Sequence, residues 1–515
     1  MGALLALTLF VMLTAAGCPF FRREGPPADE EPQVATFVGS ERCKTCHGDI
    51  YEGWAKTLHP KMLQDVDKEG AVVADFEKNE AFKADEADYT VGSKWRQQFL
   101  VREGDHFFIL PKQWIVETEE WADYHPDDWK KPERAWDTNC AGCHTTGFDP
   151  EELTWVDPGV GCEACHGPGS LHVAGGGDPD QIFGSVDSQV CGACHTRGKT
   201  PDGKFGFPID YRPGDDLSDV FEPVEVKAGE NTDAFWGNAM SRQNRQQYLD
   251  WTRSDHATAL GTLTENDHAQ DFCLNCHSAD YRLAEEDAKP TLDTAKFSVT
   301  CVVCHTTHGN GKESPQLRLK REEICTTCHN GGLREEKFPA GEAIHHGQKE
   351  LFLGIGGYGV EDAPSFHQQA GVTCVDCHMV KVATSAVPYD ISNHTFKVIL
   401  PREGMQYEMP DSCTVCHKGA SQENRQAIID GWQDEIMSTL DEIKPRLTDA
   451  QQRWKQAEEA GKDVSQAKEL YNKAFTNVSL VESDRSLGVH NIGYARALLA
   501  EAESFLDQFD QVLPE

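Results

Sequence analysis

Nine copies of one five-residue pattern, C-x-x-C-H, constrain the fold of this chain more than any other feature of its sequence. The copies, numbered here as motifs one to nine, are CKTCH (43–47), CAGCH (140–144), CEACH (162–166), CGACH (191–195), CLNCH (273–277), CVVCH (301–305), CTTCH (325–329), CVDCH (374–378) and CTVCH (413–417). They use all but one of the 19 cysteines. Only Cys18 is left over.

Each motif contains the residues that hold one haem. Two cysteines one helical turn apart can form thioethers with the two vinyl groups of a porphyrin, and the adjacent histidine then lies beneath the iron as its proximal ligand. A single C-x-x-C could equally be half of a zinc site or a redox dithiol, but nine copies that all end in histidine exclude both. We therefore predict nine covalently attached haem c groups, with thioethers from Cys43, Cys46, Cys140, Cys143, Cys162, Cys165, Cys191, Cys194, Cys273, Cys276, Cys301, Cys304, Cys325, Cys328, Cys374, Cys377, Cys413 and Cys416 and proximal ligands His47, His144, His166, His195, His277, His305, His329, His378 and His417.

The other histidines are candidates for the sixth iron ligand. The chain has 21 histidines, and the candidates outside the motifs are His59, His172, His256, His268, His308, His345, His346, His367, His394 and His490. His106, in a predicted hairpin, and His125, in the acidic loop YHPDDW, are expected at the surface instead. The surplus is sufficient for two imidazoles on every iron, which gives a low-spin iron that exchanges electrons and cannot bind a substrate. The sequence does not distinguish His345 from His346.

A short repeat helps to assign two of these candidates. The pattern Y-x-x-W-x-x-x-x-H occurs at 51–59 and at 248–256, so each copy carries two aromatic residues and one histidine beside a haem motif. We expect His59 and His256 to be distal ligands, with the aromatic side chains packed on the porphyrin. For the iron of His277, the nearby candidates are His256 and His268.

The spacing of the motifs predicts that the haems touch. Residues 43 to 417 provide only about 42 residues for each motif. So short a segment cannot shield a macrocycle from water by itself, and neighbouring porphyrins must cover one another. Close porphyrin edges make electron transfer along the row fast.

The N-terminus is typical of an exported protein. The stretch MGALLALTLFVMLTAAGCPF has an apolar run that is too short to span a bilayer and suits the central region of a signal peptide. Ala15-Ala16-Gly17-Cys18 resembles a bacterial lipobox, so we expect a lipid anchor on Cys18; the alternative is a signal peptide whose cleavage removes Cys18. We predict a signal peptide at 1–17 and a polar tether at 18–40.

The charge limits the partners. The net charge is −37, which excludes nucleic acid as a partner because phosphates need Lys and Arg. It favours docking to a basic redox protein; the alternative is that the acidity serves only solubility.

Predicted secondary structure gives a mainly α-helical and loop fold. Residues 94–117 predict a β-hairpin around an EGD turn, between motifs one and two. The Gly/Pro/Asp-rich connector 200–217 indicates a boundary. Apolar residues spaced by three and four predict an amphipathic helix that begins near Ser421, followed by two or three more. The expected regions are 41–217 with four motifs, 218–420 with five, and a C-terminal helical bundle at 421–515.

Both regions resemble known families. CHTTGFD (143–149), GVGCEACHGPGSLHV (159–173) and the connector resemble the tetrahaem cytochromes that take electrons from hydroxylamine oxidoreductase. The rest resembles pentahaem ammonia-forming cytochrome c nitrite reductases and their octahaem relatives, through QQYLDW (246–251), FCLNCHSAD (272–280), FHQQAGVTCVDCHM (366–379), ISNHTF (391–396) and SDRSLGVHNIGYARALL (483–499). This resemblance implies that His367 and His490 are distal ligands.

The departures from the nitrite reductases bear on catalysis. Their catalytic haem usually has a lysine where this chain has His277, and they carry a tyrosine after the third haem motif where this chain has CTTCHNGG (325–332). We therefore interpret the catalytic site as lost. His345 and His346 stand at roughly the offset of the family's active-site histidine, which leaves a reductase as an alternative.

Three functions follow from these observations. The favoured one is an exported electron-transfer cytochrome, anchored to the outer membrane, that relays electrons between periplasmic or surface partners in anaerobic respiration. The second is a nitrite, hydroxylamine or sulfur-oxyanion reductase that uses one five-coordinate haem. The third is a subunit of a polymeric cytochrome filament, in which a spare histidine ligates a haem of the next chain.

Overall fold

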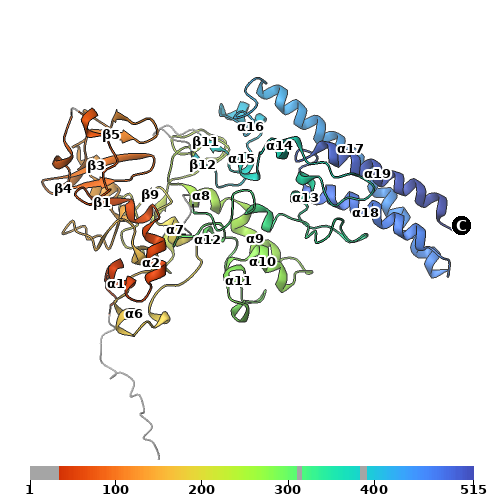
Figure 1. Ribbon diagram of the computed structural model, residues 1–515, viewed down its shortest axis with the longest axis horizontal. Helices are drawn as coiled ribbons and strands as arrows, with labels where there is room; N and C mark the ends of the chain where they lie inside the picture. The colour runs from red at the N-terminus through yellow and green to blue at the C-terminus, as the bar shows by residue number, and fades with distance from the viewer. Residues whose placement is uncertain (1–33, 80, 310–315, 383–390, 515) are drawn as a thin grey trace, which may run out of the picture.

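The computed structural model describes residues 34–79, 81–309, 316–382 and 391–514. A β-sheet lies at one end of the molecule and a bundle of long helices at the other, with short helices and loops between them (Figure 1). Cys18 and the expected signal peptide lie outside the described residues. Among the described residues no helix is both long and apolar enough to cross a bilayer.

The sheet contains the predicted hairpin. It has six strands in the order β1-β2-β3-β5-β6, with β4 also paired to β3: β1 (Leu63–Asp65), β2 (Tyr89–Val91), β3 (Arg96–Glu103), β4 (His106–Ile109), β5 (Lys112–Ile115) and β6 (Glu120–Asp123). Glu103 pairs with His106 across the turn, where Gly104 adopts a φ of 63°. The hairpin prediction is confirmed. The wider sheet was not predicted, and it forms because the eight-residue β3 is long enough to pair with three strands.

Both faces of the sheet are covered. Leu100 packs with Leu63, Phe107 and Trp136 on one face, where α3 (Trp136–Asn139) brings the start of motif two against the sheet. Phe99 packs on the other face with aromatic side chains from the loops. Side chains on neighbouring positions of a strand point to opposite faces, so residues 97–100 of β3 are buried continuously instead of alternately.

Short helices hold most of the motifs. A helical turn suits the motif because residues three apart lie on one face, which directs both cysteines to the same porphyrin. The helices before the bundle are α1 (Ser40–Lys44), α2 (Gly48–Ala55), α3 (Trp136–Asn139), α4 (Ala141–His144), α5 (Cys162–His166), α6 (Ser170–Ala174), α7 (Gln189–Gly192), α8 (Gln247–Thr252), α9 (Asp255–Thr264), α10 (Leu274–His277), α11 (Ala279–Leu283), α12 (Cys301–Cys304), α13 (Gln348–Leu353), α14 (Phe366–Gln369), α15 (Cys374–His378) and α16 (Pro401–Tyr407). Three two-stranded sheets join the loops: β7 (Thr145–Thr146) with β8 (Asp157–Pro158), β9 (Gly198–Lys199) with β10 (Glu222–Pro223), and β11 (Lys381–Val382) with β12 (Ile391–Ser392).

The C-terminal bundle is made of α17 (Gln422–Glu459), α18 (Ser465–Asp484) and α19 (Ile492–Val512), which lie side by side (Figure 1). The Ser421 hydroxyl caps α17 by accepting from the backbone N–H of Asn424 at 3.3 Å, as the predicted helix start requires. Ile436, Leu440 and Ile443 are buried at spacings of four and three. Each such side chain contributes about 1.5–3 kcal/mol on burial, so this bundle holds its own apolar core.

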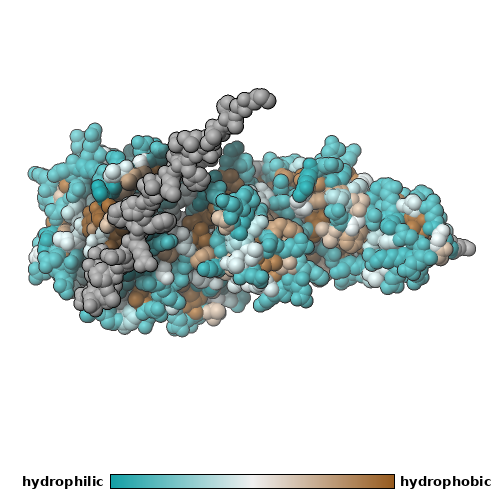
Figure 2. Space-filling view, turned by 90° about the horizontal axis from the view of Figure 1, so that it is seen from below, coloured by the Kyte–Doolittle hydropathy of each residue, from teal (hydrophilic) through white to brown (hydrophobic). Residues whose placement is uncertain are grey.

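The middle of the molecule has a different interior. A continuous cavity of about 3720 Å³ runs through it, and residues of motifs two to nine line it. Apolar side chains gather in the hollows of this middle part in the space-filling view (Figure 2). A cavity of this size lined by cysteine and histidine fits a set of large planar groups that supply the missing core.

Candidate haem-binding sites

Contacts between cysteines of different motifs show which motifs are neighbours. Five pairs of thiols interact directly: Cys43 with Cys162, Cys143 with Cys194, Cys191 with Cys301, Cys276 with Cys328, and Cys325 with Cys374. Electrostatic interactions connect three further neighbours: Cys165 with Cys191, Cys304 with Cys328, and Cys377 with Cys413. Since each thiol would be the attachment point of a porphyrin, neighbouring thiols would bring the edges of neighbouring porphyrins together.

These contacts define a line with two branches. The line runs through motifs one, three, four, six, seven, eight and nine. Motif two is attached to it beside motif four, and motif five beside motif seven. We call motifs two and five the branch motifs.

The histidine rings meet in pairs at one characteristic separation. An imidazole nitrogen lies about 2 Å from a bound transition metal and about 1.1 Å from its own ring centre, so two rings on opposite sides of one iron have centres roughly 6 Å apart. The observed centroid distances are 6.2 Å for His47–His172, 6.0 Å for His166–His308, 6.4 Å for His305–His394, 6.0 Å for His329–His256, 6.2 Å for His378–His490 and 6.1 Å for His417–His367. Each pair therefore fits one haem iron.

Motif four completes the line. Burial lowers the pKa of His59 to about 4, and the charge of the nearby His195 acts in the same direction. A buried neutral imidazole is the form that binds iron. Every motif of the line thus has at least one histidine from elsewhere in the chain near its proximal histidine. At motif seven His346 also lies near, with its ring centroid 5.8 Å from that of His329.

The two branch motifs depart from this rule in opposite directions. At motif five, the ring centroid of His346 lies 6.1 Å from that of His277. One ring nitrogen from each of His277, His345 and His346 lies within 4.8 Å of the other two. At motif two, no second imidazole among the described residues contacts His144 or interacts with its charge. Burial lowers the pKa of His144 to about 4, with Arg245 and Arg96 acting in the same direction.

The short sequence repeat is also a structural repeat. The indole N–H of Trp54 donates to the Val160 carbonyl at 3.0 Å, and that of Trp251 donates to the Val299 carbonyl at 2.8 Å. The two valines stand two residues before motifs three and six. Their N–H groups donate to the carbonyls of His59, at 3.0 Å, and His256, at 3.1 Å.

Further hydrogen bonds extend this repeat. The backbone N–H of Cys162 donates to the Ser40 hydroxyl at 3.0 Å, and that of Cys301 donates to the Ser188 hydroxyl at 3.2 Å. Each serine stands three residues before the motif that pairs with the cysteine. A third, partial copy places the Val372 N–H 2.9 Å from the His367 carbonyl, before motif eight. The same scaffold thus occurs at motifs one and three, four and six, and seven and eight, and each copy directs a histidine to the next motif.

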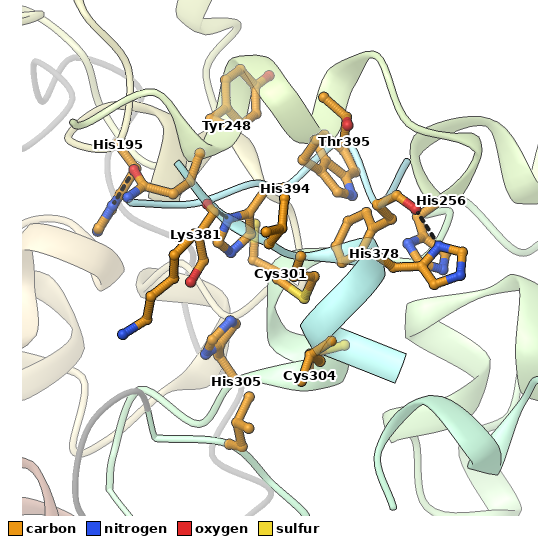
Figure 3. A pocket seen from close by; sticks show the side chains of 18 of the residues that line it. His195, Tyr248, His256, Cys301, Cys304, His305, His378, Lys381, His394 and Thr395 are labelled. Atoms are coloured by element: carbon orange, nitrogen blue, oxygen red, sulfur yellow. Dashed lines mark hydrogen bonds between the residues drawn. The ribbon is translucent and has the colours of Figure 1, made fainter. Parts of the chain in front are cut away.

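Motif six shows how one site is assembled. In the close view, His305 and His394 lie on opposite sides of the space beside Cys301 and Cys304 (Figure 3). The Nδ1 atom of His394 is 2.9 Å from the Ser392 carbonyl, and burial lowers its pKa to about 4. The backbone N–H of His394 also donates to the Asp250 carboxylate at 3.4 Å. The loop that follows β12 is therefore fastened to α8 from the second repeat.

The second nitrogen of the ring fixes how a histidine ligand faces its iron. Besides that of His394, five Nδ1 atoms lie against backbone carbonyl oxygens: His144 on Met62 at 3.3 Å, His166 on Phe183 at 2.7 Å, His172 on Asp178 at 2.8 Å, His277 on Ala259 at 3.1 Å, and His378 on Phe396 at 2.9 Å. His195 is 3.4 Å from the side-chain oxygen of Gln247. His490 alone among these rings has a carboxylate, since its Nδ1 lies 2.5 Å from Asp484.

The histidine near His277 differs from the one predicted from the sequence. For the iron of His277 we expected His256 or His268, but the structure brings His346 there and places His256 beside His329. His268 is exposed in a turn after α9. Closeness along the chain misled the prediction, because α9 packs against α10 of motif five while the ring of His256 lies beside His329 of motif seven.

The two histidines expected at the surface are outside the pairs. His106, in β4, has a side chain that is 45% exposed and bonds Asp137 at 2.9 Å. His125 has a side chain that is 41% exposed and packs against Tyr124. Sequence reasoning missed Asp484, the hydrogen-bond partner of His490. No sequence signal pointed to it, because a single aspartate near a turn is common.

Nine attachment motifs, paired imidazoles and a continuous cavity between a sheet and a helical bundle define a multihaem c-type cytochrome. Comparison with known proteins agrees. The chain is 36% identical to the outer cell wall cytochrome OcwA, whose crystal structure it matches with a TM-score of 0.78 over 91% of this chain and 99% of that one. The chain therefore belongs to the multihaem cytochrome c family, and its haems are covalently bound haem c.

Two family models match separate parts of the chain. The model for cytochrome c554 and c-prime matches residues 42–94 and 115–167, and the model for cytochrome c552 matches residues 360–513. Both matches fall in the regions where the sequence resembles the tetrahaem cytochromes and the nitrite reductases, respectively.

Other solved and curated proteins are more distant. An undecahaem cytochrome from the S-layer of Carboxydothermus ferrireducens is 25% identical, with a TM-score of 0.62 over 94% of this chain and 71% of that one. The octahaem sulfite reductase MccA of Wolinella succinogenes shares the fold, at 15% identity and a TM-score of 0.51 over 93% of this chain and 84% of that one. The multihaem cytochrome MtrA of Shewanella baltica (strain OS185) is 25% identical over 178 residues, which are 33% of this chain and 42% of MtrA. The chain thus spans less than half the length of this curated relative.

Proposed function

We propose that this protein is an exported nonahaem cytochrome that relays electrons between redox partners at the cell surface. The observation that carries the proposal is the line of seven motifs, in which each proximal histidine has at least one other imidazole nearby and each motif lies next to the following one through its cysteines. Iron with two histidines changes little in geometry on reduction, which suits electron transfer. The bound haems supply the redox chemistry.

The chain's own residues would position the groups. The distal ligands of the line are His172, His308, His59, His394, His256, His490 and His367, for motifs one, three, four, six, seven, eight and nine. His346 would be the distal ligand of motif five. The repeated serine, tryptophan and valine hydrogen bonds would keep successive porphyrin edges in contact.

The location and partners belong to the same proposal. The outer cell wall and S-layer cytochromes that this chain resembles support a place outside the cytoplasm. A signal peptide and a lipid on Cys18 would anchor the chain to the outer membrane through a polar tether. The net charge of −37 favours a redox partner with a basic docking face.

Electron paramagnetic resonance of the oxidised protein tests the relay, together with its intact mass. We expect a mass that corresponds to nine haems and signals that are almost all low-spin. Two or more high-spin irons in the line would contradict the relay. A mass with fewer haems would contradict the attachment of one haem per motif.

A second function, a reductase at one five-coordinate iron, is favoured by motif two. His144 has no imidazole opposite it among the described residues. One high-spin iron that binds cyanide or nitrite, with reduction of nitrite or hydroxylamine by a reduced dye, would support this reductase. The absence of any high-spin iron would exclude it.

A further inference from the structure

One ligand in the line differs chemically from all others that the hydrogen bonds define. The Nδ1 of His490 lies 2.5 Å from an oxygen of Asp484, and the Asp484 side chain has no exposed surface. The imidazoles of motifs one, two, three, five, six and eight that have a backbone partner donate instead to neutral carbonyls. A carboxylate accepts a proton far more strongly than a peptide carbonyl does.

The surroundings hold this carboxylate in place. The Ser486 hydroxyl and its backbone N–H both donate to the second oxygen of Asp484, the latter at 3.1 Å. The backbone N–H of His490 donates to the Ser486 hydroxyl at 3.0 Å. Asp484 is the last residue of α18, and the loop to α19 wraps around it. The packed bundle therefore fixes the carboxylate beside the ring.

We propose that Asp484 lowers the reduction potential of the haem at motif eight by drawing the Nδ1 proton of its distal ligand, His490. An imidazole whose outer nitrogen donates to a carboxylate is a more basic ligand and stabilises the ferric over the ferrous iron. The buried negative charge acts in the same direction, and it also reaches His378 on the other side of this site. Asp484 is thus a positioning residue that acts through His490.

The place of motif eight gives this effect a consequence, which rests on the proposed relay. Cys374 touches motif seven through Cys325, and Cys377 interacts electrostatically with Cys413 of motif nine. Electrons passing between motif nine and the rest of the line must cross motif eight. A haem of low potential at this position makes one step uphill, and Asp484 then sets the rate of exchange with the C-terminal end of the line.

The test uses the full haem-bearing protein. Asp484→Asn keeps the shape of the side chain and removes its charge, so the lowest potentials in a spectroscopic redox titration should rise. We expect about a tenfold change in the ferric-to-ferrous ratio of one haem, which is 59 mV for a one-electron couple. Asp484→Glu should restore most of the wild-type titration.

A matched variant separates ligand basicity from charge alone. Asp376 is a carboxylate within motif eight itself, but its hydrogen-bond partners among the described residues are Thr373 and Arg321 and include no imidazole. Asp376→Asn should shift the titration much less than Asp484→Asn does. Equal shifts in the two variants, or wild-type potentials in Asp484→Asn, would overturn the proposal.

A measurement on the wild-type protein covers the case in which Asp484→Asn fails to fold. Near-infrared magnetic circular dichroism of the oxidised protein should show one haem whose charge-transfer band is displaced from that of neutral bis-imidazole haems. Identical bands for all low-spin haems would refute the proposal. Neither the redox titration nor the spectrum needs a partner protein. A failure of the relay function, seen as no electron exchange with redox proteins, can therefore be distinguished from a failure of this proposal.

Discussion

The line and the two branch motifs obtain their distal histidines in different ways. Along the line, repeated hydrogen bonds at Trp54 and Trp251 direct one histidine from each copy of the scaffold to the next motif. The branch motifs lie outside this repeat, and one has no second imidazole among the described residues while the other has two. The attachment pattern is the same in all nine motifs. The reactivity of each iron is therefore decided by its distal ligand. The repeat fixes this ligand along the line, whereas the ligand differs between the two branch motifs.

The largest effect is expected from making motif five like motif two. His346→Ala should remove the distal ligand and add one high-spin iron per chain, seen by electron paramagnetic resonance, with one extra equivalent of bound cyanide. His345→Ala is the matched control and should leave the spectrum unchanged, because the ring of His346 is the one that stands 6.1 Å from His277. The reverse result would assign His345 as the ligand.

A smaller effect is expected from the cations of motif two. Arg96, in β3, acts on His144 together with Arg245. Arg96→Gln should weaken the binding of an anion such as azide to the wild-type high-spin iron by about 3- to 10-fold, since one nearby charge is worth about 1 kcal/mol or more near a protein surface. Arg102→Gln, at the exposed end of the same strand, should leave the azide titration unaltered. Equal losses in both variants would show that the effect is not local to motif two.

The scaffold of the line gives a third test. Trp54→Phe and Trp251→Phe each remove one hydrogen bond to a carbonyl beside a motif, which should cost about 1 kcal/mol in the free energy of unfolding. The two losses should add, because the two indoles bond different carbonyls. Trp121→Phe is a control: it removes a bond of the same kind, to the Asp75 carbonyl at 2.8 Å, far from any motif. Only the first two variants should also broaden the haem signals of motifs three and six. Strong non-additivity would show that the two copies are coupled.

Much of this arrangement was readable from the sequence, and the rest was not for definite physical reasons. The motifs, the hairpin and the start of α17 follow from local spacing, so the sequence was enough for them. The choice of His346 for motif five depends on which loops pass over His277, which is a long-range property. The carboxylate on His490 lies six residues before it in a tight turn, a contact that only the fold of the α18–α19 connection brings about.

The last predicted effect is a pH dependence of the free energy of unfolding that arises at one residue beside the line. Asp250, in α8, binds the Ser241 hydroxyl at 2.7 Å, Arg253 at 3.0 Å and the backbone of His394, and burial raises its pKa to about 6. An unfolded aspartate titrates near 3.9. Between these values the folded state holds a proton that the unfolded state has released, so the free energy of unfolding falls as pH rises from about 4 to about 6 and is level above.

Asp250→Asn should abolish this part of the pH profile, which amounts to about 1–3 kcal/mol, measured by chemical unfolding at pH 4.5 and pH 7. Asp216→Asn is the surface control. Hydrogen bonds from Ser218 lower the pKa of Asp216, so this carboxylate favours the folded state more at high pH than at low pH, and its loss should change the pH profile of the unfolding free energy in the direction opposite to Asp250→Asn. If the unfolding free energy of Asp250→Asn depended on pH as that of the wild type does, the Asp250 carboxylate would be ionised over the whole range from pH 4.5 to pH 7. The fastening of the His394 segment to α8 would then be a charged contact at every pH, and the line would be rigid in acid as well as at neutrality.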